Sequence, residues 1–163
     1  MKKFELTAES KINIFGKKLF RIKALISFGD VEEGEIGGWI EKEENLEQSS
    51  GDAWVYGNAR VYGDAEVSGD AEVSGNARVS GNAEVYGNAD YTTIHGFGTQ
   101  FRTTTFFQCE DKQIRVSCGC FLGTIPEFRE QVKNTREGKI VEEYLMIADL
   151  MEKHFVKEKE SGE

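Results

Sequence analysis

Residues 51–92 consist of seven consecutive six-residue units, each of the form Gly-Asx-Ala-x-Val-x, with Tyr replacing Val in the last. Residues two apart in a strand face the same side. We therefore expect Ala and Val to point inward and the residue between them to point outward. Disordered low-complexity segments lack a large apolar residue at a fixed phase. The repeat therefore predicts an ordered β structure.

Each Gly-Asx pair marks a corner, because Gly and Asn tolerate positive φ and Asx side chains bond nearby backbone groups. A strand and a corner in every six residues close into a three-sided coil, in which residues 18 apart stack. The units resemble those of the hexapeptide-repeat family of left-handed parallel β-helices, and the left hand comes from that resemblance. We therefore expect a mainly β fold with a left-handed parallel β-helix over residues 28–108, whose regular repeats occupy 51–92.

The segments on either side of the repeats predict caps. Residues 11–27 alternate apolar and polar residues around GKK (16–18), which is typical of a β-hairpin, and we expect an N-terminal β cap over 1–27. Residues 109–163 are expected to form a strand followed by a helical segment. There TIPE (124–127) is a capping box, and residues 139–156 carry apolar side chains at helical spacing.

Composition excludes several classes of protein. The chain of 163 residues has a net charge of −9, and an acidic surface disfavours general binding of DNA or RNA. No apolar run reaches the roughly 18 residues of a membrane span. The first ten residues contain no apolar core of a secretory signal, and the three cysteines are an odd number. We expect a cytoplasmic protein without disulfides and without a membrane association.

Stacking at 18-residue spacing brings like residues together on the outer surface. Arg60 and Arg78 would share one face with Tyr62, and Trp54 would be an exposed aromatic on the neighbouring face. Exposed Arg, Tyr and Trp often dominate binding energy, so these four residues are the predicted binding face. A second-choice face carries two acidic residues, Glu66 and Glu84. The alternative is that all these residues are solvated positions that maintain solubility.

Two residue types could carry chemistry. The hexapeptide-repeat resemblance implies acyltransferases that use a His as general base, and His95 is the reasonable candidate, although no acceptor-binding loop is evident. Cys109, Cys118 and Cys120 could bind zinc or supply a reactive thiol. Their Cys-Gly-Cys spacing, however, matches no usual zinc pattern, so buried cysteines are expected instead. We predict no metal, no cofactor and no acetyl transfer.

Two flanking segments, FRIKALISFGDVEEGEIGGWIEKEENL (20–46) and CGCFLGTIPEFREQV (118–132), resemble those of small phage and prophage proteins that carry such repeats. The resemblance implies a mobile-element origin and no established chemistry. The resulting hypothesis is a non-catalytic, anti-defence binding protein that inhibits or sequesters a host component in the host cytoplasm. That component would be a bacterial immune protein or its small nucleotide signal.

Two other functional classes remain open, an acyltransferase that uses His95 and a structural module of a virion or filament. We also expect a homo-oligomer, either a trimer or a dimer. The grounds are the family resemblance and the apolar stripe of the last helix, which a small fold leaves uncovered.

Overall fold

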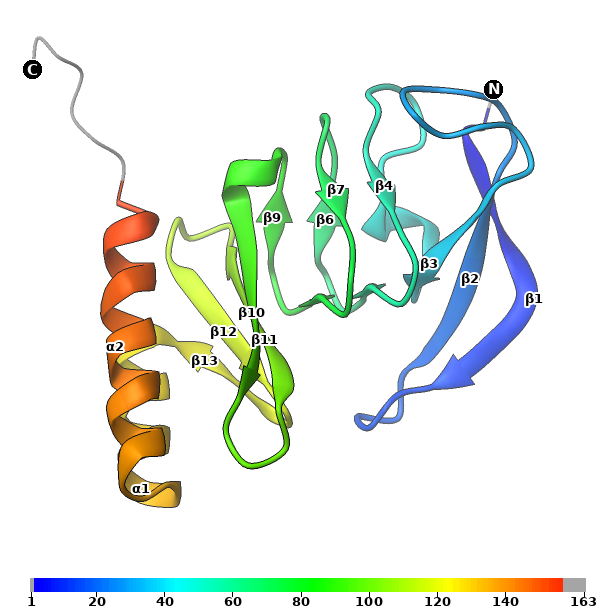
Figure 1. The fold of residues 1–163 in the computed structure, drawn as a ribbon. Helices are drawn as coiled ribbons and strands as arrows, with labels where there is room; N and C mark the ends of the chain where they lie inside the picture. Colours follow the sequence, from blue (N-terminus) through cyan, green and yellow to red (C-terminus); the bar gives the residue numbers. More distant parts are fainter. Residues whose placement is uncertain (1, 157–163) are drawn as a thin grey trace, which may run out of the picture.

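The computed structural model describes residues 2–156, which form a mainly β structure with two C-terminal helices (Figure 1). The first sheet has five strands in the order β1-β2-β3-β5-β8 and is mixed. Its first three strands are antiparallel, and β3, β5 and β8 then pair in parallel. The strands of this sheet are β1 (Phe4–Ile12), β2 (Lys18–Ala24), β3 (Ile36–Ile40), β5 (Arg60–Val61) and β8 (Arg78–Val79).

The repeats form short parallel pairs between strands 18 residues apart, as the spacing predicted. Besides β5 with β8, the pairs are β4 (Trp54–Val55) with β7 (Glu72–Val73), and β6 (Glu66–Val67) with β9 (Glu84–Val85). The predicted inward positions of the first six units are confirmed, because their Ala and Val side chains are buried: Ala53, Val55, Ala59, Val61, Ala65, Val67, Ala71, Val73, Ala77, Val79, Ala83 and Val85.

The prediction of a left-handed parallel β-helix over residues 28–108 is wrong. The structure divides this segment among several separate sheets, namely part of the mixed five-stranded sheet, two parallel strand pairs and an antiparallel C-terminal sheet. The seventh unit does not continue the pattern, since Asn88–Asp90 form a short 3-10 helix (η2) and Ala89 is exposed. No Gly-Asx corner follows, so the chain runs straight through β10 (Tyr91–Phe97) and folds back antiparallel along β11 (Arg102–Gln108).

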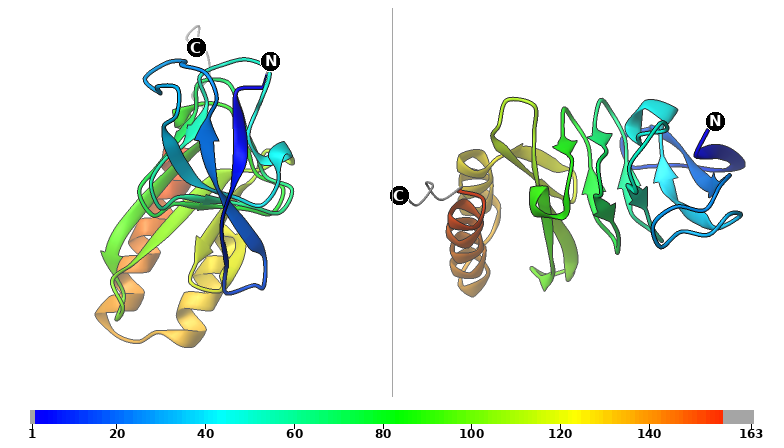
Figure 2. Two further views of the ribbon diagram at one scale, coloured as in Figure 1. Left: turned by 90° about the vertical axis from the view of Figure 1, so that its right-hand side faces the viewer. Right: turned by 90° about the horizontal axis from the view of Figure 1, so that it is seen from above.

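The C-terminal part is an antiparallel sheet covered by the two helices, and Figure 2 places the repeats between it and the N-terminal strands. The predicted capping box is confirmed. The Thr124 hydroxyl accepts a hydrogen bond from the Glu127 amide at 3.3 Å, and the Glu127 carboxylate accepts one from the Thr124 amide at 2.8 Å. The elements are β10, β11, β12 (Ile114–Cys118), β13 (Phe121–Thr124), α1 (Ile125–Thr135) and α2 (Lys139–His154).

Two large apolar cores and a small cluster of Leu19, Trp39 and Tyr62 lie within the described residues. The larger contains the inward Ala and Val of the repeats with Phe4, Ile22 and Ile40 from the N-terminal strands. The second joins the C-terminal sheet to the helices, where the rings of Phe106 and Tyr144 meet Phe128 edge to face. Neither helix has the length and apolar character that crossing a membrane requires.

Candidate functional site

Two hollows lie along the outward side of β5 and β8, and we name them together the trough. Its floor is this side of the two strands. One wall is the β1–β2 turn, which contributes Phe15, and the other is the C-terminal sheet, which contributes Arg102 and Leu122. The hairpin turns of both walls project on the lower side of the repeats in Figure 1. Against the C-terminal wall the trough contains a hollow of about 230 Å³, here named the basic cleft. The side chains that give it its character are Asn58, Arg60, Asn76, Arg78, His95 and Arg102.

The floor of the basic cleft presents two stacked guanidinium groups. Arg60 and Arg78 are register partners in the parallel β5–β8 pair, so their backbones lie about 4.8 Å apart. Both side chains are half-buried. The Arg78 amide donates a hydrogen bond to the Thr105 hydroxyl at 3.0 Å, which ties the floor to β11. The stacking of Arg60 and Arg78 predicted from the sequence is therefore confirmed.

The wall of the basic cleft adds a third arginine and a histidine from β10 and β11. His95 is exposed, and its Nδ1 lies 2.9 Å from the Thr103 hydroxyl. The guanidinium of Arg102 lies against Gly119, where a Cβ atom would overlap it. Gly119 also has a φ of +60°, in the left-handed region that favours glycine. Glycine at this turn therefore permits the position of Arg102.

The arginines of the cleft carry positive charge that no carboxylate of the described residues pairs with. Within residues 2–156, neither Arg60 nor Arg78 nor Arg102 forms an ion pair with a carboxylate. The two corners beside them carry neutral Asn58 and Asn76 rather than Asp. In a chain with a net charge of −9, these cations form a localised positive site.

The pKa values of Arg60 in the cleft and of Lys11, which lies outside it, reflect this crowding. Burial and the neighbouring Arg78 lower the pKa of the Arg60 guanidinium. Burial, together with Arg60 and nearby arginines, lowers the pKa of Lys11, whose ammonium group lies over the Trp39 ring at 4.2 Å from its centroid. Both lowered pKa values mean that burial and the neighbouring positive charges destabilise the charged forms of Arg60 and Lys11. An anion bound beside these groups would stabilise their charged forms.

The prediction that Trp54 is exposed is wrong, because its side chain is 0% exposed. The residue does occupy the outer side of its strand, but the N-terminal segment folds over this face. The rings of Phe4 and Phe28 pack edge-on against Trp54, with centroids 6.4 and 5.4 Å away. Tyr62 is also mostly covered, at 6% exposure, and the Phe15 ring lies 6.2 Å from it.

The second-choice face brings Glu66 and Glu84 together as register partners of β6 and β9. Glu66 is exposed, whereas Glu84 is half-buried and its carboxylate lies 3.6 Å from the Lys112 ammonium group. Lys112 comes from the turn between β11 and β12. This contact compensates one of the two acidic charges, so the face offers a weaker electrostatic site than the basic cleft.

The cysteines are free, and they differ in exposure. Cys109 and Cys118 are buried, and Cys120 is exposed next to Gly119. Burial raises the pKa of the Cys109 thiol to about 11. Among residues 2–156, no group of three His, Cys, Asp or Glu side chains is placed to hold a metal ion.

We expect one fast-reacting thiol in the native protein, that of Cys120, and three after denaturation. Thiol titration with Ellman's reagent measures both numbers. Three fast thiols in the folded protein would contradict the burial of Cys109 and Cys118.

We also expect the stability of the protein to fall as the pH rises from about 9 to about 11. The unfolded chain ionises the Cys109 thiol near pH 9, whereas the native state keeps the proton up to about pH 11. Alkaline melts of the wild type and of Cys109→Ala measure this effect, which should be smaller in the variant.

Comparison with protein-family models and with curated protein sequences found no match.

Proposed function

We propose that this protein is a non-catalytic binding protein that holds a phosphate-bearing ligand in the basic cleft. The observation that carries the proposal is the convergence of Arg60, Arg78 and Arg102 without a carboxylate partner among residues 2–156. Guanidinium groups bind phosphate bidentately. The two stacked arginines would each bind one phosphoryl group, and Asn58 and Asn76 would add neutral donors.

The size of the cleft favours a small ligand over the surface of a protein. A hollow of about 230 Å³ is small beside the roughly 300–1,000 Å³ of most small-molecule sites, and it holds a phosphorylated group rather than a folded partner. Under the hypothesis of a phage-encoded protein, the ligand would be the nucleotide signal of a host immune system. The protein would then act by sequestering that signal.

The test is calorimetry with pyrophosphate, whose two phosphoryl groups match the two stacked arginines. The double variant Arg60→Gln with Arg78→Gln should weaken binding by about 100-fold or more, because hydrogen bonds to charged groups contribute roughly 1.5–3 kcal/mol each. The control is Lys133→Gln with Lys153→Gln, which changes the net charge equally on the helices. No binding by the wild type, or unchanged binding by the folded double variant, would refute the proposal.

The second candidate is acyl transfer with His95 as general base. It is favoured by one observation, that His95 lies in the same cleft as the three arginines, where a phosphorylated acyl carrier would bind. The assay offers acetyl-coenzyme A together with amine and hydroxyl acceptors, to which the acetyl group would pass as His95 takes the acceptor's proton and the coenzyme leaves as a free thiol. In the binding-protein proposal, this protein releases no such thiol. Catalysed thiol release that disappears in His95→Ala would replace the first proposal by the second.

A further inference from the structure

A second hollow lies in the same trough beside the basic cleft, and it is apolar. It has a volume of about 290 Å³. Its walls are Phe15 from the β1–β2 turn and Leu122 from β13, each 45% exposed, and its floor is Tyr62 with the backbone of Gly63 and Gly81. We refer to it as the apolar hollow. Large apolar side chains that face an open hollow stay in contact with water, and a ligand that covers them gains binding free energy by removing that water.

The two hollows are built on the same strands, two residues apart. Arg60 of the basic cleft is followed by Tyr62 of the apolar hollow, and Arg78 is followed by Ser80. The Tyr62 amide donates to the Val79 carbonyl at 3.0 Å, so the β5–β8 pairing continues between them. Two residues along a strand span about 6.6 Å. The hollows are therefore neighbours along one continuous floor.

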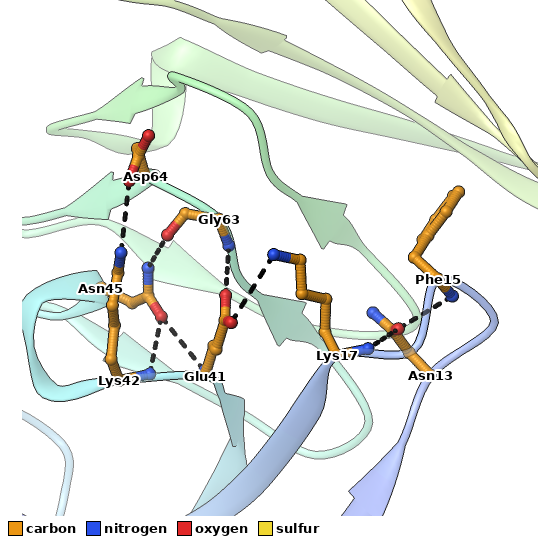
Figure 3. Close-up of polar contacts among 8 residues, drawn as sticks. All are labelled: Asn13, Phe15, Lys17, Glu41, Lys42, Asn45, Gly63 and Asp64. Carbon is orange, nitrogen blue, oxygen red and sulfur yellow. Dashed lines mark hydrogen bonds and ion pairs between the residues drawn. The ribbon is translucent and has the colours of Figure 1, made fainter.

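The wall that carries Phe15 is held in place by hydrogen bonds, as Figure 3 shows. The Asn13 side-chain oxygen accepts from the amides of Phe15 and Lys17, both at 2.9 Å, which fixes the turn. The Lys17 ammonium group lies 3.8 Å from the Glu41 carboxylate, and Glu41 in turn accepts from the Gly63 amide at 2.8 Å. The turn is thereby tied to the floor, so the hollow is pre-formed.

The opposite wall is equally defined. A Cβ atom built on Gly81 would lie 3.7 Å from a methyl carbon of Leu122, so the Leu122 side chain lies over bare backbone. The space between Phe15 and Leu122 is floored by two glycines that add no side chains. Such a space suits a flat aromatic ring, which would lie between the two apolar side chains.

We infer that the ligand of the trough is a nucleotide, with its phosphates in the basic cleft and its base in the apolar hollow between Phe15 and Leu122. The inference rests on the proposed function, since it uses the basic cleft as the phosphate site. One sugar ring separates base from phosphate in a nucleotide, and the hollows are separated by two residues of one strand. A single nucleotide is therefore long enough to reach both hollows. Its flat base would cover the exposed side chains of Phe15 and Leu122.

The experiment compares pyrophosphate with the diphosphates of adenosine, guanosine, cytidine and uridine by calorimetry. At least one nucleoside diphosphate should bind 10-fold or more tightly than pyrophosphate. The double variant Phe15→Ser with Leu122→Ser should remove this advantage and leave pyrophosphate binding unchanged within twofold. Each side chain is 45% exposed, and a urea melt of the double variant that matches the wild type shows that its fold is intact. The control is Ile14→Ser, in the same turn and 64% exposed, which should change neither affinity.

The outcomes separate the two proposals. If pyrophosphate binds and no nucleoside diphosphate binds more tightly, the nucleotide inference fails while the proposed function stands. If a nucleoside diphosphate binds more tightly but the Phe15 and Leu122 double variant keeps that advantage, the base lies elsewhere and the inference also fails. If pyrophosphate does not bind, the proposed function fails, and the nucleotide inference fails with it whether or not a nucleotide binds, because the inference uses the basic cleft as its phosphate site.

Discussion

Replacing Val73 by Asp should unfold the protein, whereas Glu72→Gln on the same strand should leave it stable. Val73 is fully buried and pairs in register with Val55 inside the larger core. An aspartate there would bury a carboxylate among alanine and valine side chains with no hydrogen-bond donor. We expect a loss of about 4 kcal/mol or more, which is a large fraction of the 5–15 kcal/mol that stabilises a typical domain.

The Glu72 variant is the matched control, because the side chain is exposed one residue away on β7. Its substitution should change the free energy of unfolding by no more than about 0.5 kcal/mol. Urea denaturation followed by circular dichroism measures both values. Equal losses for the two variants would mean that the inward and outward sides of the repeats are assigned wrongly.

The second large effect is expected at Gly69, compared with Gly75 at an equivalent corner. Both have a left-handed φ, +63° and +65°. An alanine Cβ would overlap the backbone carbonyl of Tyr86 at Gly69 but would meet open space at Gly75. Alanine in this conformation costs roughly 1–2 kcal/mol, which is the loss expected for Gly75→Ala. At Gly69 the backbone must also shift, so the loss should reach about 3 kcal/mol or more.

Thermal and urea melts of the two alanine variants give the comparison. Because φ is nearly the same, the difference between them isolates the close approach of Tyr86 to the corner at Gly69. A Gly69→Ala variant as stable as Gly75→Ala would show that the corners are spaced more loosely than the structure has them.

The sequence predicted correctly those features that follow from regular spacing within the repeats or from a short local motif. The inward Ala and Val of the first six units, the stacking of Arg60 on Arg78, and the capping box at Thr124 depend on regular spacing in the sequence, and all are confirmed.

The sequence failed where distant segments meet. Trp54 was expected to be exposed, but Phe4 and Phe28 cover it, and no repeat periodicity contains that contact. His95 and Arg102 reach the cleft because β10 and β11 fold back antiparallel after the last unit, which ended the expected β-helix. Phe15 likewise enters the trough through a hairpin turn far from the repeats in sequence.

The 18-residue pairing also makes the number of repeat units set the width of the trough. Three additional units would place one more strand between the N-terminal hairpin and the C-terminal sheet, which would move these two walls about 4.8 Å further apart while both remain on the same face. One or two additional units would instead move the C-terminal sheet to a different face and separate His95 and Arg102 from the stacked arginines. Tandem duplication can therefore adapt such a trough to wider ligands only in steps of three units.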